Sequence, residues 1–223
     1  MSAFDSVRHR LRQTFLTPTI PNDNSWKGTE LSTDNFTNRV PILFQNVRAF
    51  KFHKDGNTLQ DLVHMQDCYG IDILYLSEHH QDTTKVRKQL KLTDIVQQAV
   101  PGQATCQFDS SGERNPLGTT KPGGTGIVTV GPMIGQLEPH GKSGDAMGRW
   151  SHMTFRRNGK TPVTVIAVYQ VCKEPTNALG FTAWHQQRRA LDLAGPSIHP
   201  RKAFIDNLIA VIQAFQAYQP IHG

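Results

Sequence analysis

Two apolar runs of the sequence end in side chains that can bind a hard cation. The run 41–47 contains Asn46, and the run 71–77 is followed directly by Glu78. Oxygen ligands at successive strand ends suit Mg²⁺, which binds one or two carboxylates together with water and phosphate oxygens. We therefore expect a cation site at the carboxyl edge of a sheet, where α/β proteins place their sites.

Basic and aromatic residues add candidates for phosphate binding. The candidate nucleic-acid contacts are Arg48, His80, Lys121 and Arg149. Tyr169, at the end of another apolar run, can donate a hydrogen bond to a phosphate oxygen. Adjacent residues of a strand point to opposite faces, so at most one of His79 and His80 should serve the site.

Most of these residues also have an ordinary structural alternative. Glu78 can cap the following helix, and Asn46 can close a turn. Tyr169 can pack in the core, and Trp150 is expected to do so. A surface lysine or arginine is usually only solvated.

Composition limits the class of protein. The 223 residues carry a net charge of +6, and 37% of them are hydrophobic, which fits a soluble domain with polyanionic partners. No apolar run approaches the roughly 18 residues that span a bilayer. The three cysteines are widely spaced and predict neither disulfides nor a zinc site, which favours an intracellular protein.

Patterning predicts an extended or disordered basic arm over 1–39 and one domain over 40–223. We expect helices from Thr58, over 82–99 and from Pro200, the second with Leu90, Ile95, Val96 and Ala99 facing inward. Asn158-Gly159 signals a hairpin turn. The expected strands lie at 41–48, 71–77, 104–108, 126–130, 136–139, 150–155 and 163–169. The first strand–helix–strand unit predicts two parallel strands in an α/β fold.

The order of Asn46, Glu78, the run 123–128 (Gly-Gly-Thr-Gly-Ile-Val) and Val168-Tyr169 resembles the N-terminal half of the endonuclease/exonuclease/phosphatase superfamily. The resemblance covers about residues 41–218. The subgroup that it is most similar to is the endonuclease-like domain that accompanies reverse transcriptases in non-LTR retrotransposons.

The resemblance implies roles for these residues. Glu78 would bind Mg²⁺, with Mn²⁺ as the alternative cation, and Asn46 would orient a water or a phosphate oxygen. Tyr169 would bind the scissile phosphate of a nucleic acid, with DNA favoured over RNA. A retroelement origin would imply a nuclear location. The family fold is a four-layer sandwich, of which we expect a part: essentially one mixed sheet with flanking helices.

The sequence departs from this family in ways that bear on activity. The family's Gly-Asp-x-Asn and Ser-Asp-His stretches, which supply further catalytic groups, are not found in it. Cys172 and Arg48 stand where related enzymes often have Asn and a carboxylate. We therefore expect a weakly held cation, no Mg²⁺-dependent nicking by the isolated chain, and association through an uncovered sheet face.

The sequence thus predicts a truncated Mg²⁺-dependent phosphodiesterase or endonuclease-like domain that acts on nucleic acid. Two alternatives stay open: an inactive nucleic-acid-binding remnant, and a phosphatase-type relative that acts on small phosphate esters.

Overall fold

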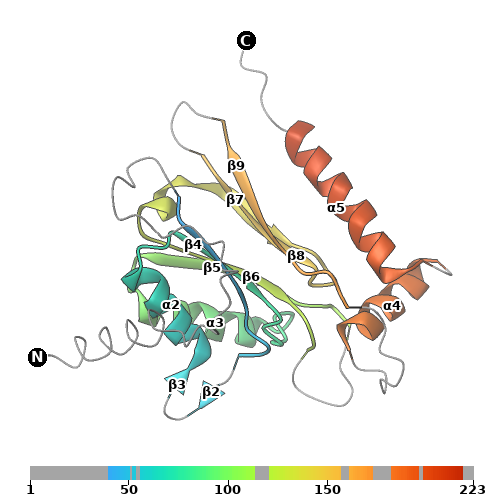
Figure 1. Cartoon of the computed structure of the whole chain (residues 1–223), viewed down its shortest axis with the longest axis horizontal. Coiled ribbons are helices and arrows are strands. Elements are labelled where there is room, and N and C mark those ends of the chain that lie inside the picture. Colours follow the sequence, from blue (N-terminus) through green and yellow to red (C-terminus); the bar gives the residue numbers. More distant parts are fainter. Residues whose placement is uncertain are drawn as a thin grey trace, which may run out of the picture.

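The computed structural model describes residues 40–50, 52–53, 56–113, 121–156, 161–172, 182–195 and 198–217. In these ranges the chain forms four layers, in which two sheets lie face to face and helices cover the outside of each (Figure 1). The predicted arm 1–39 and the predicted turn at Asn158-Gly159 lie outside the described residues.

The first sheet contains four strands in the order β1-β4-β6-β5. Their bounds are β1 Ile42–Asn46, β4 Ile73–Ser77, β6 Thr125–Val130 and β5 Ala104–Asp109. β1 and β4 are parallel, as the strand–helix–strand pattern predicts, whereas β6 runs antiparallel to its neighbours. The expected α/β class with a mixed sheet is therefore confirmed.

Two helices, α2 (Thr58–Cys68) and α3 (Val86–Ala99), cover the outer face of this sheet. Between β1 and α2 lie the short paired strands β2 (Phe52–His53) and β3 (Gly56–Asn57). The core on this side is built from fully buried side chains such as Leu59, Val63, Leu74, Val96 and Val128. Each contributes about 1.5–3 kcal/mol by leaving water.

One expectation for α3 is wrong. Leu90, expected to face inward, is 58% exposed, while Ile95, Val96 and Ala99 are buried as predicted. The helix therefore contacts the core mainly through its C-terminal half.

The second sheet is antiparallel, in the order β7-β8-β9. It consists of β7 (Leu137–Gly144), β8 (Trp150–Phe155) and β9 (Val163–Val168), and the 3-10 helix η2 (Gly131–Gln136) leads into it. Met153, Phe155 and Ala167 of this sheet pack against Ile73 and Ile127 of the first. The expectation of essentially one sheet is thus corrected: the inner face of the first sheet is largely covered by a second sheet.

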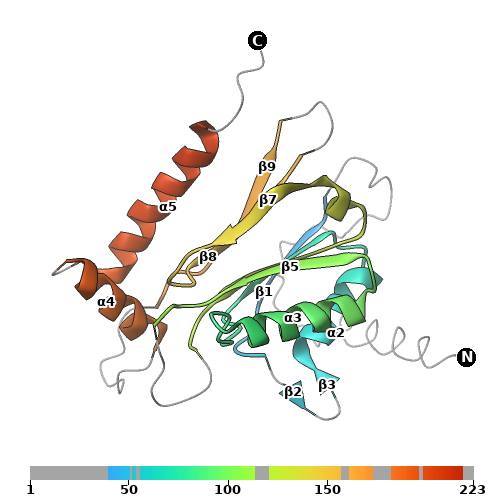
Figure 2. The ribbon, with the colours of Figure 1, turned by 180° about the vertical axis from the view of Figure 1, so that it is seen from behind.

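Two C-terminal helices complete the fourth layer. α5 (Pro200–Ala217) begins at Pro200, as predicted, and α4 (Ala183–Ala194) precedes it. α5 lies along the outer side of the second sheet (Figure 2). Its Phe204 ring lies 6.4 Å from that of Trp150, and its Phe215 ring lies 4.8 Å from that of His152. Trp150 is a core residue, as expected. Within the described ranges, no helix is long and apolar enough to cross a membrane.

Candidate functional site

The strands of both sheets bring Asn46, Glu78 and Tyr169 to one end of the sandwich. Asn46 ends β1 and pairs in register with Ser77, the last residue of β4, which Glu78 follows. Tyr169 follows β9, and its hydroxyl hydrogen-bonds the carboxylate of Glu78. These residues lie together as expected, but Tyr169 comes from the second sheet rather than from the same one.

Backbone strain is concentrated at this end. The φ angles of Arg48, Ala49, Glu78 and His80 are 47°, 87°, 59° and 56°. Side chains with a Cβ disfavour this left-handed region by about 1–2 kcal/mol per residue. Such strain persists only where the surroundings hold it, and it clusters at functional sites.

Hydrogen bonds from both sides hold the strained segment 78–80. The backbone N–H of Ala49 donates to Glu78 O (2.7 Å), and Glu78 N–H donates to Gly124 O (2.8 Å). His80 N–H donates to Gly123 O (3.0 Å). The Gly123-Gly124 segment therefore fixes the backbone that carries Glu78.

His79 fills the space behind Glu78 and is fully buried. Its Nε2 lies 3.0 Å from Asp109 O and 3.2 Å from Thr125 O, and its Nδ1 accepts the Gln81 N–H at 3.0 Å. Because carbonyls only accept, the proton is on Nε2 and the ring is neutral. Burial lowers the pKa of His79 to about 4. Of the adjacent pair, His79 is thus structural, and only His80 can face a ligand.

The environment of the candidate residues keeps Tyr169 a donor. Burial, followed by the neighbouring Glu78 carboxylate, raises the pKa of Tyr169, so its hydroxyl stays protonated and can hydrogen-bond an anion. His80 is partly buried, and burial lowers the pKa of its imidazole while Glu78 opposes that shift. One edge of the Tyr169 ring packs over Gly123, where an added Cβ would lie 3.2 Å from the ring.

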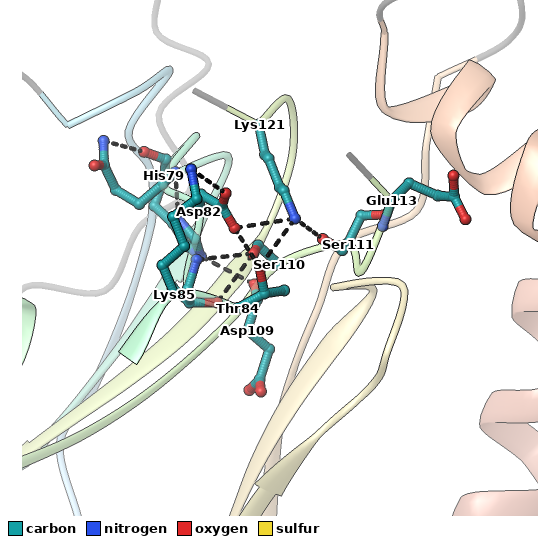
Figure 3. Close-up of polar contacts among 11 residues, drawn as sticks. His79, Asp82, Thr84, Lys85, Asp109, Ser110, Ser111, Glu113 and Lys121 are labelled. Carbon is teal, nitrogen blue, oxygen red and sulfur yellow. Dashed lines mark hydrogen bonds and ion pairs between the residues drawn. The ribbon is translucent and has the colours of Figure 1, made fainter. Parts of the chain in front are cut away.

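Lys121 does not fit the predicted phosphate contact. It is 3% exposed, and its ammonium lies 3.0 Å from the Asp82 carboxylate and also donates to Thr84 and Ser111 (Figure 3). Burial alone would raise the pKa of Asp82, but hydrogen bonds from Thr84 and Lys121 lower it. Lys121 therefore anchors the loop before Gly123, and its charge is already paired.

Arg149 does not fit the predicted phosphate contact either, because it is also buried and paired. Its side chain is 2% exposed, with Nε 2.7 Å and Nη2 3.0 Å from the two Asp145 oxygens. The guanidinium carbon also lies 4.6 Å from the centre of the Trp150 ring. This bidentate pair fixes the turn before β8, and it leaves no route for a phosphate to reach the charge.

Three polar residues at this end are more accessible. The Asn46 side-chain oxygen accepts the Arg48 backbone N–H at 3.1 Å, which closes a turn and leaves the amide group to donate. The Arg48 side chain is exposed. Arg201, at the start of α5, is also exposed and donates to Gln170, next to Tyr169 (3.2 Å). Arg201 is not among the residues that the sequence predicts to bind phosphate, although Pro200 marks it as part of the first helical turn.

The donor set at Glu78 suits a hard cation. Mg²⁺ commonly keeps several waters and binds through one or two carboxylates, and Glu78 could supply one such carboxylate. Among the described residues, no group of three or more His, Cys, Asp or Glu side chains is placed to hold a metal ion.

Comparisons with known proteins give only a weak structural similarity. No family model matches the sequence, and no curated protein matches it significantly. A solved structure, an endonuclease/exonuclease/phosphatase family protein from Leptotrichia buccalis C-1013-b, is weakly similar, with a TM-score of 0.39 and 12% sequence identity. The match covers 70% of this chain and 63% of that protein.

Proposed function

We propose that this chain is an endonuclease- or phosphodiesterase-like domain that binds the backbone of nucleic acid through a Mg²⁺ ion at Glu78, and that it derives from a retroelement. The observation that carries the proposal is the strained Glu78 backbone, whose carboxylate is hydrogen-bonded by Tyr169 where the two sheets end together. The net charge of +6 favours a polyanion as the ligand.

The accessible residues divide the binding between them. Glu78 would hold the cation, which would supply positive charge to the phosphate. The Asn46 amide would donate a hydrogen bond to phosphate, and His80 would add a further donor, while the Tyr169 hydroxyl would hold the Glu78 carboxylate in place. Arg48 and Arg201 are the basic side chains that would contact the nucleic-acid backbone, because both are exposed. They take the place of Lys121 and Arg149 in the proposal.

Mg²⁺-dependent DNA binding tests the proposal. Fluorescence anisotropy with a labelled duplex should show affinity that is at least about tenfold higher in Mg²⁺ than in EDTA, since a tenfold change corresponds to only about 1.4 kcal/mol. Glu78→Gln should lose that difference. Glu138→Gln is the matched control, because Glu138 lies on β7 where that strand pairs with the far end of β8.

The salt dependence of binding identifies the class of ligand. Affinity for the duplex should fall steeply as salt rises, because cations bound to DNA are released. Equal affinity for wild-type protein and Glu78→Gln in Mg²⁺ would contradict the proposed cation site. Salt-independent binding, together with tight binding of a small phosphate ester, would favour a phosphatase-type protein instead.

A further inference from the structure

The sandwich is closed on one side and open on the other. β5 and β7, the edges on one side, contact each other across the two sheets. On the other side β9 lies over β4, so β1 extends one strand beyond the second sheet. Figure 1 is viewed from the side of β1 and β9, and Figure 2 is viewed from the side of β5 and β7. The open side is therefore a step one strand wide.

Apolar side chains line this step. On the inner face of β1, Ile42 and Phe44 are 50% and 56% exposed, and Val40 just before them is 44% exposed. On β9, Val163, which has the same strand parity as the inward-facing Val165 and Ala167, is 60% exposed. An aromatic side chain buries about 150–250 Å² when fully covered, so Phe44 alone leaves on the order of 100 Å² in water. A patch of this kind at two neighbouring sheet edges is typical of an interaction surface.

The strand directions make the step complementary to itself. β1 is parallel to β4, and β9 ends beside Glu78, which follows β4, so β1 and β9 run in the same direction. A twofold axis parallel to the strands keeps that direction. It would place β9 of a second copy beside β1, and β1 of the second copy beside β9, so that both sheets continue without a gap.

We propose that two copies of this chain associate in this way and form one continuous sandwich. The overhanging β1 of each copy fills the step of the other. The five residues of β1 and the six of β9 are similar in length, which allows both pairings. Across the sandwich the two β1 strands stack, and Ile42 and Phe44 of one copy pack against the same residues of the other.

The dimer would also bring the two candidate sites to one end of the joined sandwich. Because the axis runs along the strands, it brings the Glu78 ends of both copies to the same end of the joined sandwich. Arg48 of each copy, which follows β1, then lies near the axis, and the two Glu78 residues lie one strand away from it on opposite sides. The association itself does not depend on the proposed function.

Sedimentation equilibrium of the full chain tests the association. We expect a dimer, and we expect Ile42→Asp to raise the dissociation constant at least tenfold, because the symmetry buries the new carboxylate twice. Ile209→Asp is the matched control, since Ile209 on α5 has the same residue type and the same 50% exposure. Val163→Asp tests the other edge, should Ile42→Asp fail to fold.

Cross-linking tests the direction of the axis. The exposed Cys68 and Cys172 are first replaced by serine. In the Val40→Cys variant, a short bismaleimide should then join the new thiol of one copy to the same thiol of the other, because stacked sheets lie about 10 Å apart. Antiparallel pairing of two β1 strands would instead link Val40→Cys to Asn46→Cys in a mixture. That pattern, a monomeric wild-type chain, or dissociation by Ile209→Asp but not by Ile42→Asp would overturn the proposal.

Discussion

Two sets of polar residues lie at the same end of the sandwich and differ in how fully their groups are bonded. The buried network consists of His79, Asp82, Lys121, Asp145 and Arg149, which are shielded from solvent and paired within the chain. The accessible cluster consists of Asn46, Arg48, Glu78, His80 and Tyr169, which lie in part on the surface. The first set maintains the loops, and the second has groups left to bind a ligand.

The difference shows why a basic residue near a Gly-rich loop is a poor guide to phosphate binding. Lys121 precedes Gly123-Gly124, yet its ammonium group forms an ion pair with the carboxylate of Asp82, which lies 39 positions earlier in the sequence. A buried cation must be paired. By contrast, Glu78 is displayed on a strained backbone that the same loop holds in place.

The largest effect should come from breaking the buried network. Arg149→Ala leaves the Asp145 carboxylate buried without its bidentate partner, and removing one member of a buried pair costs about 3–5 kcal/mol. Urea unfolding should show that loss. Arg188→Ala, which removes the exposed i,i+4 pair with Asp192, should cost at most about 1 kcal/mol. Equal losses in the two variants would contradict the assignment of Arg149 to the network.

The next largest effect is the loss of folding stability at low pH. His79 has a pKa of about 4 in the folded chain against about 6.5 when unfolded, so only the unfolded state takes up this proton between those values. The contribution of neutral His79 to the free energy of unfolding is therefore complete above pH 6.5. It is lost as pH falls toward 4, by on the order of 3 kcal/mol. Urea midpoints across that range should fall less steeply for His79→Gln than for the wild type. Parallel pH profiles would place His79 outside the buried network.

A smaller effect is expected at Gly124. It has φ +89°, and an added Cβ would lie 2.5 Å from the His79 ring. Gly124→Ala therefore adds a clash to backbone strain, and the two together should cost about 2–4 kcal/mol. Gly70→Ala is the matched control: Gly70 has φ +62° with nothing within 4 Å, so only the strain, about 1–2 kcal/mol, applies. A similar loss of stability in both variants would mean that the His79 packing does not restrict Gly124.

Much of the fold could be predicted because its patterns are local. The run 71–77 and the helix from Thr58 are apolar at the spacing that their structures require, and both are present. α4 was missed because its buried face includes Gln186 and Gln187, which are 0% and 2% exposed and interrupt the apolar period. The overhang of β1 over the second sheet depends on how two sheets stack, which no local pattern reports.

The site was predicted in part for the same reason. Glu78 and Asn46 follow parallel strands, so their proximity follows from topology. Tyr169 reaches them from the other sheet, whereas the sequence predicted a single sheet for all three residues. The ion pairs of Lys121 with Asp82 and of Arg149 with Asp145 could not be predicted, because no local pattern reports which carboxylate a basic side chain meets in the fold.

The smallest expected effect is on cleavage itself, and it sharpens the comparison most. Phosphodiester hydrolysis needs a positioned water, a base and a cation, and a base contributes about 10² to 10⁴-fold. Among the described histidines near Glu78, His79 is sealed in the buried network, which leaves His80. We expect nicking of supercoiled plasmid by the wild-type chain in Mg²⁺ to equal that of Glu78→Ala. Nicking that Glu78→Ala abolishes would show a working base, and His80→Ala against His64→Ala, with His64 on α2, would then show whether His80 supplies it.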